Sequence, residues 1–226
     1  MGRIRPADTR PSTSSARRGA ARRRGSLIGL LCWPGVLLYL LYVYAFYLIG
    51  VPFNALFLVY LTLVTLNVYA LIGLVASIDG DAVRQRFTAR APVRIIGGVL
   101  VVLAFLFIAR TVFAVVTVLT SHAAIDSMVF ASWISDCAVQ CPALIIGGIL
   151  LWRRDALGYV VGAGLLLQLG VLFAGLPVSL MLGALLTGSP VDASSAVILP
   201  FGVILFILLA FFVRAAVPGR SLSLAS

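Results

Sequence analysis

The sequence has no lysine and no glutamate, and it has one histidine, His122. Its three cysteines, Cys32, Cys137 and Cys141, lie within apolar runs. One histidine excludes a haem held by two histidines of this chain and any histidine-rich metal centre. Three cysteines in apolar segments are too few for the disulfide framework of a small secreted domain. The sequence therefore predicts neither a metal site nor a cofactor.

Charge of either sign is scarce. Charged residues make up 11% of the 226 residues and hydrophobic residues 62%, and the mean hydropathy is +1.14. Soluble domains are about 45–50% apolar, and disordered chains combine low hydrophobicity with high charge. This balance predicts an integral membrane protein. The exclusive use of arginine and aspartate is typical of a high-GC bacterial genome, so we expect the bacterial cytoplasmic membrane.

Motifs of catalysis are also missing. The sequence contains no G-x-S-x-G, no H-E-x-x-H and no P-loop. Asp79-Gly80-Asp81 lacks the further aspartates that membrane phosphatidyltransferases carry at fixed spacing. The stretches outside the apolar segments are also shorter than the roughly 50 residues of the smallest domains. No catalytic residue is predicted, and an enzyme is the least favoured of the functions considered.

Long apolar runs define the architecture. Crossing a bilayer takes roughly 20 residues of helix, and lipid-exposed backbone must be helical to satisfy its own hydrogen bonds. Segments of that length are found at 27–49, 54–77, 95–119, 129–151, 157–179 and 196–216. The sequence predicts an all-α bundle of six transmembrane helices within residues 26–217, followed by a short tail, 218–226. The fifth run stays apolar to Leu186, so we expect a kink or break near Gly175 and Pro177.

The arginines fix the expected orientation. Every arginine except Arg110 lies in the arm 1–25, the loop 78–94, the turn 152–156 or the C-terminal end. The intervening turns near 50–53, 120–128 and 187–195 contain none. Because positively charged loops remain in the cytoplasm, both termini are predicted to be cytoplasmic. The net charge of +10 is thereby explained by the membrane, and no nucleic-acid partner is expected.

Two arginine-rich segments are candidates for lipid binding. The arm 1–25 has no apolar period and is expected to be disordered. In the loop 78–94, Asp79 or Asp81 can cap a short helix that runs to about residue 90. Its arginines are then placed to contact anionic lipid headgroups: Arg84, Arg86 and Arg90. An ordinary positive-inside loop is the alternative.

Polar residues within the predicted spans form the candidate site. Arg110 in the third span and Asp136 in the fourth lie at similar distances from the same membrane face, which predicts an ion pair between these helices. Gln140 lies one turn from Asp136, and Pro142 is expected to bend the helix beside them. Two mid-span amides complete the predicted polar cluster: Asn67 and Gln168. A structural salt bridge and an ion, proton or small-solute site are both open interpretations.

Small residues mark a predicted packing face. Gly158 and Gly162 have the small-x-x-x-small spacing that lets helices approach closely, within the chain or between copies in a homo-oligomer. The tetrapeptide Ile-Ile-Gly-Gly occurs at 95–98 and again at 145–148, without further similarity around it.

The stretch from Pro142 to Gly162, PALIIGGILLWRRDALGYVVG, resembles the helix–arginine turn–helix hairpin of multi-pass bacterial membrane proteins that have no established activity. The resemblance covers about the last third of the chain, and it implies no functional residue. Two functions fit the sequence. The first is a small channel, carrier or carrier subunit that uses the polar cluster. The alternative is a membrane scaffold or partner subunit that binds anionic lipid or a cytoplasmic protein through its arginines.

Overall fold

A computed structural model describes residues 13–84, 87, 92–122, 124–188 and 193–215. These residues form α-helices and one π-helical turn, with no strand among them. In chain order the helices are α1 (Thr13–Gly50), α2 (Phe57–Ser77), α3 (Gly80–Arg84), α4 (Val93–Ser121), α5 (Ser127–Ser135), the π turn η1 (Asp136–Gln140), α6 (Cys141–Trp152), α7 (Ala156–Thr187) and α8 (Ala193–Ala215).

Six helical segments of the described chain are long and apolar enough to cross a membrane, as the sequence predicts. They lie in α1, α2, α4, the continuous α5–η1–α6 rod, α7 and α8. Their boundaries match the predicted spans to within a few residues, apart from the start of α1 and the end of α7. All-helical architecture follows because apolar runs of this length carry no strand alternation.

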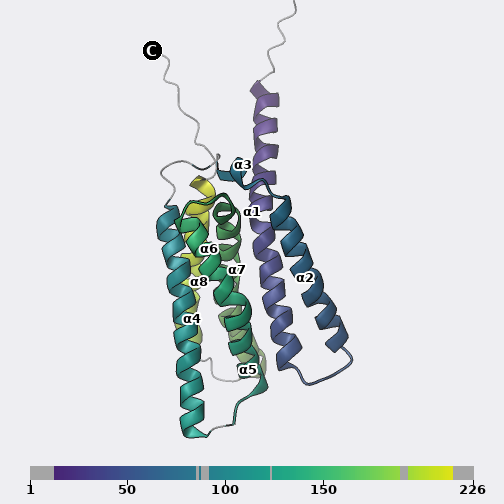
Figure 1. The fold of residues 1–226 in the computed structure, drawn as a ribbon, viewed down its shortest axis with the longest axis vertical. Helices are drawn as coiled ribbons and strands as arrows, with labels where there is room; N and C mark the ends of the chain where they lie inside the picture. Colours follow the sequence, from purple (N-terminus) through teal and green to yellow (C-terminus); the bar gives the residue numbers. More distant parts are fainter. Residues whose placement is uncertain (1–12, 85–86, 88–91, 123, 189–192, 216–226) are drawn as a thin grey trace, which may run out of the picture.

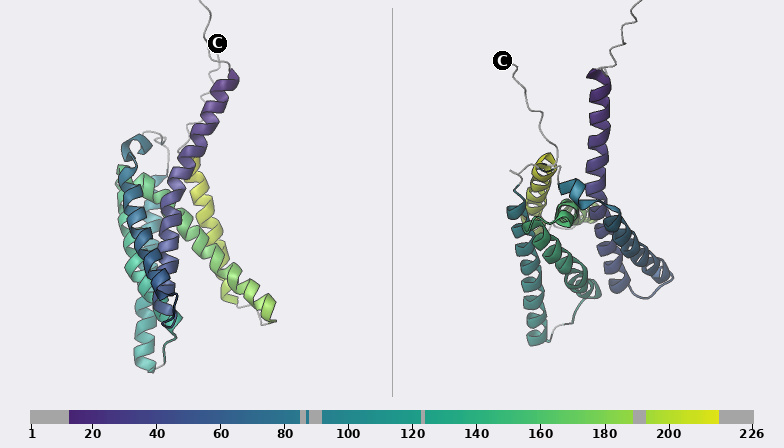
Figure 2. Two further views of the ribbon diagram at one scale, coloured as in Figure 1. Left: turned by 90° about the vertical axis from the view of Figure 1, so that its right-hand side faces the viewer. Right: turned by 45° about the horizontal axis from the view of Figure 1, so that its top comes forward.

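The helix ends sort to two ends of the bundle. The ends of α2, α6 and α8 and the starts of α4 and α7 lie at one end, and the ends of α4 and α7 and the starts of α2, α5 and α8 lie at the other, with the end of α1 (Figure 1). Arginines of the first end, such as Arg84, Arg94 and Arg154, therefore occupy one side of the bundle, called here the arginine end. At the opposite end, α7 and α8 lean away from the other helices (Figure 2).

Helix α7 is the centre of the packing. It contacts α1, α6 and α8, and its half nearer the arginine end is almost entirely buried. Leu165, Leu166 and Leu169 have no exposed surface, and they join Leu144 of α6 and Leu205 of α8 in one core. Helix α2 packs mainly on α1 and leaves most of its apolar surface exposed.

Glycines set the closest helix contacts. A Cβ atom on Gly97 of α4 would lie 2.7 Å from the carbonyl oxygen of Gly148 on α6, so these backbones touch. The two Ile-Ile-Gly-Gly segments thus pack against each other, which their similarity alone did not predict. A Cβ on Gly164 of α7 would likewise lie 2.7 Å from the amide nitrogen of Gly35 on α1. Such contacts bring apolar helices together through dispersion alone.

Two helices are longer than predicted. Helix α1 begins at Thr13, so residues 13–25, expected to be disordered, are helical, whereas 1–12 lie outside the described residues. Alanine and arginine favour helix, and extending an existing helix needs no new nucleus. Helix α7 continues through Pro177 to Thr187, so the expected break is absent. One hydrogen bond lost to proline is tolerated within a long apolar helix.

The predicted loop helix is shorter than expected. Helix α3 covers Gly80–Arg84, and most of 85–90 lies outside the described residues. The predicted tail 218–226 also lies outside them. Val83 is buried, and the Phe87 ring lies 4.7 Å from that of Tyr159 and 4.9 Å from that of Phe212. These apolar contacts hold the segment against α7 and α8.

The glycine contact between α4 and α6 predicts unequal effects of alanine. Gly97→Ala places a methyl group against backbone atoms that cannot move aside, and it should lower the free energy of unfolding by about 1–3 kcal/mol. Gly73→Ala on α2 is the control, because nothing lies within 4 Å of its Cβ position. Titration with denaturing detergent measures both, and equal stabilities of the two variants would contradict the packing.

Candidate functional site

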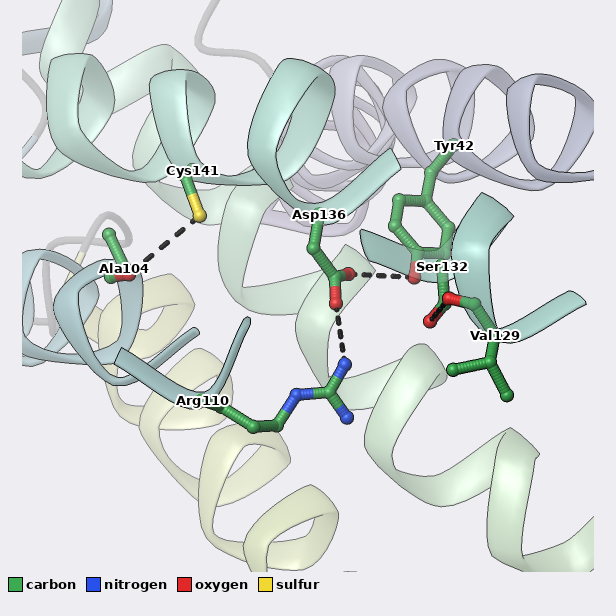
Figure 3. A network of polar contacts seen from close by, with 7 residues as sticks. All are labelled: Tyr42, Ala104, Arg110, Val129, Ser132, Asp136 and Cys141. Carbon is green, nitrogen blue, oxygen red and sulfur yellow. Dashed lines mark hydrogen bonds and ion pairs between the residues drawn. The ribbon is translucent and has the colours of Figure 1, made fainter. Parts of the chain in front are cut away.

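Asp136 is the buried acidic residue of the described chain. It lies where α5 passes into η1, with 2% of its side chain exposed. The Tyr42 hydroxyl of α1 donates a hydrogen bond of 2.9 Å to its Oδ1, and Arg110 Nη2 of α4 lies 2.9 Å from its Oδ2 (Figure 3). One carboxylate therefore joins three helices. The ion pair predicted between Arg110 and Asp136 is present in the structure.

A π-helical turn shapes the backbone at this carboxylate. The Cys141 amide donates to the Asp136 carbonyl, five residues back, so the helix is wider than an α-helix here. Pro142 follows directly; it has no amide hydrogen, and its ring crowds the carbonyl four residues earlier. The widened turn accommodates that crowding, and it lies directly before the proline at which a bend was expected. π turns of this kind occur frequently at functional sites.

The two ions of the pair differ in exposure. The Arg110 side chain is 59% exposed, against 2% for Asp136. A guanidinium has five N–H donors, and toward the described residues this one makes a single hydrogen bond, to Asp136. The carboxylate therefore anchors the arginine from the inside of the bundle. The other N–H groups of Arg110 make no hydrogen bond to the described residues and are available to a ligand.

Gln140 and Gln168 form a second polar contact. Each has no exposed surface, and each amide nitrogen donates to the carbonyl oxygen of the other, across η1 and α7. This reciprocal arrangement satisfies two buried amides without water. Gln140 is four residues after Asp136 toward the arginine end, so the amide pair lies one turn deeper in the bundle than the ion pair.

Two buried hydroxyls at the same level have no partner. Thr111 follows Arg110 on α4 and Ser135 precedes Asp136 on α5, and their oxygens make no hydrogen bond to the described residues. Exposed hydroxyls such as Thr62 instead donate to a carbonyl of their own helix. Two hydroxyl groups next in sequence to the ion-pair residues are therefore available for further hydrogen bonds.

The structure separates the predicted cluster into three parts. Arg110 and Asp136 meet, Gln140 and Gln168 meet, and Asn67 donates to the Leu63 carbonyl of its own helix, apart from both pairs. Tyr42 was not assigned to the site. Its position deeper in the membrane than an aromatic belt requires was the available signal.

The remaining residues singled out in the sequence lie at helix contacts or on the surface. A Cβ on Gly158 would lie 2.5 Å from the Leu151 amide nitrogen, so this glycine packs on α6, and Gly162 lies against the Leu151 side chain. Arg84 is exposed and lies 3.9 Å from Asp81. The other loop arginines assigned to lipid lie outside the described residues: Arg86 and Arg90.

The three cysteines differ in burial. Cys141 is buried, with its Sγ 3.7 Å from the Ala104 carbonyl oxygen, and Cys137 is exposed. Within the described part of the chain, no three side chains of the metal-binding types come together. No family model, curated protein or solved structure matches the chain. The residues themselves therefore carry the functional argument.

The ion pair predicts non-additive effects of substitution. Arg110→Leu leaves a buried carboxylate without its cation and should lower the free energy of unfolding by about 3–5 kcal/mol. Asp136→Leu releases the exposed arginine and should cost less. The double variant should recover most of the loss caused by Arg110→Leu, because no unpaired buried charge remains. A double-mutant cycle of detergent denaturation measures the coupling, and additive losses would show that the pair contributes no coupling energy.

Proposed function

We propose that the chain is a multi-pass membrane protein with both termini in the cytoplasm of a bacterium, and that it carries an anionic ligand at Arg110, alone or as a carrier subunit. The six apolar helices and the arginines gathered at one end support the membrane placement. The half-exposed guanidinium within the third candidate span supports the site. An ionisable residue inside a membrane typically faces a partner or a substrate path.

The observation that carries this proposal is the contrast between the two ions. The anion is buried, whereas the cation is more than half exposed and is therefore accessible to a ligand. Tyr42 and Arg110 together neutralise and hold Asp136, so the carboxylate orients the guanidinium without blocking its other donors. A guanidinium with free donors in a low-dielectric setting binds carboxylate or phosphate strongly.

The deeper amide pair supports a carrier rather than an open channel. Gln140 and Gln168 close on each other directly below the ion pair, and Leu144 and Leu165 are fully buried beyond them. A ligand at Arg110 is thereby separated from the arginine end. Passage of the ligand would require the contact between η1 and α7 to open. The side-chain amides of Gln140 and Gln168 could then exchange their mutual hydrogen bonds for hydrogen bonds to the ligand.

A scaffold role is the second candidate. The exposed Arg84 and the other arginines of the same end form a basic surface suited to anionic headgroups or an acidic protein segment. Homo-oligomerisation remains a proposal for either function. The helices that leave most surface for it are α2 and the outer half of α7, beyond Gly175.

Anion flux in proteoliposomes tests the carrier proposal. Phosphatidylcholine liposomes are filled with the potassium salt of chloride, nitrate, phosphate, acetate or hexanoate, and valinomycin is then added to let potassium out. Because charge must balance, the rate of potassium release is limited by the rate at which the anion crosses the membrane. We expect the protein to accelerate release for at least one anion, and Arg110→Gln to reduce that acceleration at least about tenfold. Arg110→Lys should retain part of it, and Asn67→Ala, outside both polar pairs, should retain all of it.

The result that contradicts the proposal is equally definite. Release that stays at the rate of protein-free liposomes for every anion would remove the carrier function. A rate that Arg110→Gln leaves unchanged would show that this residue does not bind the transported ion. A monodisperse gel-filtration profile of the protein, unaltered in the variant, shows that the fold is retained in each case.

A further inference from the structure

An apolar groove lies between α4 and α8, and one residue of α7 also lines it. Its volume is about 420 Å³, within the usual range of small-molecule sites. Val102 and Leu103 of α4, Phe173 of α7, and Phe201 and Ile204 of α8 are among its walls, and every lining residue is apolar. A hydrocarbon chain fits such a surface.

The groove leads toward Arg110. Leu103 and Arg110 are seven residues apart on α4, which places them on one helical face about 10 Å apart along the axis. Phe107 lies between them on that face, and its ring centroid is 5.9 Å from that of Phe173, a wall of the groove. Arg110 follows Phe107 by about one turn on this face of α4, so the residue that holds Asp136 lies just beyond the aromatic contact.

The surroundings of Arg110 are apolar on the accessible side. Leu106 and Phe113, one turn before and one turn after Arg110 on α4, are 59% and 75% exposed. A soluble anion would have to leave water and reach a charge flanked by these side chains. A ligand with its own hydrocarbon chain enters from the bilayer, buries that chain in the groove and brings its charge to the guanidinium.

We infer that the site binds a single-chain anionic amphiphile from the bilayer, with a carboxylate or phosphate head at Arg110 and its chain in the groove between α4 and α8. This inference rests on the proposed role of Arg110 as the anion-binding residue. Charge complementarity selects the head and the apolar lining selects the chain, so an anionic amphiphile should bind more tightly than a neutral lipid or a short-chain anion, each of which meets only one part of the site.

Trp152 provides a reporter for the far end of the groove. Its ring lies 3.5 Å from the position that a Cβ atom on Gly98 would occupy, and Gly98 lines the groove. Gly98 is twelve residues from Arg110, about 18 Å along the helix. A sixteen-carbon chain with its head at Arg110 spans a distance of that order, so a bromine atom at its end would quench Trp152 fluorescence.

The experiment uses the full chain with Trp33→Phe and Trp133→Phe, in phosphatidylcholine nanodiscs. The probe is 16-bromohexadecanoate, and its methyl ester is the uncharged control. We expect saturable quenching by the acid above the non-saturable quenching that the ester gives. Arg110→Gln should weaken the apparent affinity at least about tenfold, and Arg110→Lys should restore part of it. Ile204→Phe fills the groove with Arg110 intact and should also remove saturation.

Each outcome separates this inference from the carrier proposal. Saturable, Arg110-dependent quenching without anion flux would support the amphiphile site and remove the carrier function. Arg110-dependent flux of short anions, with identical quenching by acid and ester, would overturn the amphiphile site and leave the carrier function standing. Saturable quenching that persists in Arg110→Gln would also overturn the inference, because the head would then be bound elsewhere. If octyl phosphate displaces the bromo acid, the site also accepts a phosphate head group.

Discussion

The buried carboxylate of Asp136 is the constraint on which the rest of the site depends. A charge among apolar helices is tolerated only when a cation and hydrogen bonds compensate it. Tyr42 and Arg110 supply these from two other helices, and the π turn before Pro142 accommodates the backbone at this point. One interaction thereby fixes the mutual placement of α1, α4 and η1, and it also decides where the guanidinium is held.

The position of a residue along its helix could be predicted from the sequence, and the rotation of each helix about its axis could not. Hydropathy located the six candidate spans of the described chain, and counting residues brought Arg110 and Asp136 to one level. The same counting grouped Asn67 with the cluster, although it bonds within α2. Which face of α1 carries Tyr42 toward Asp136 depends on the glycine contacts between helices, and these depend on packing that no single segment encodes.

The bundle combines a presented charge with an apolar surface beside it. Arg110 has donors beyond those that Asp136 uses, and the groove between α4 and α8 begins within two turns of it. Gln140 and Gln168 separate this region from the arginine end. In the proposed account, the ligand enters the groove from the bilayer and its charged head is held at Arg110. The contact between Gln140 and Gln168 keeps it from the arginine end.

The most direct test of this account asks whether Arg110 lies within the membrane. Single cysteines at His122, Phe113, Leu106 and Arg94 follow α4 from end to end, in a chain whose native cysteines are replaced by alanine. The account predicts that a membrane-impermeant maleimide labels position 122 on intact cells and position 94 only after permeabilisation. Positions 113 and 106 should react only with a lipid-soluble maleimide. Labelling at 113 as fast as at 122 would place the charged pair in water and contradict the account.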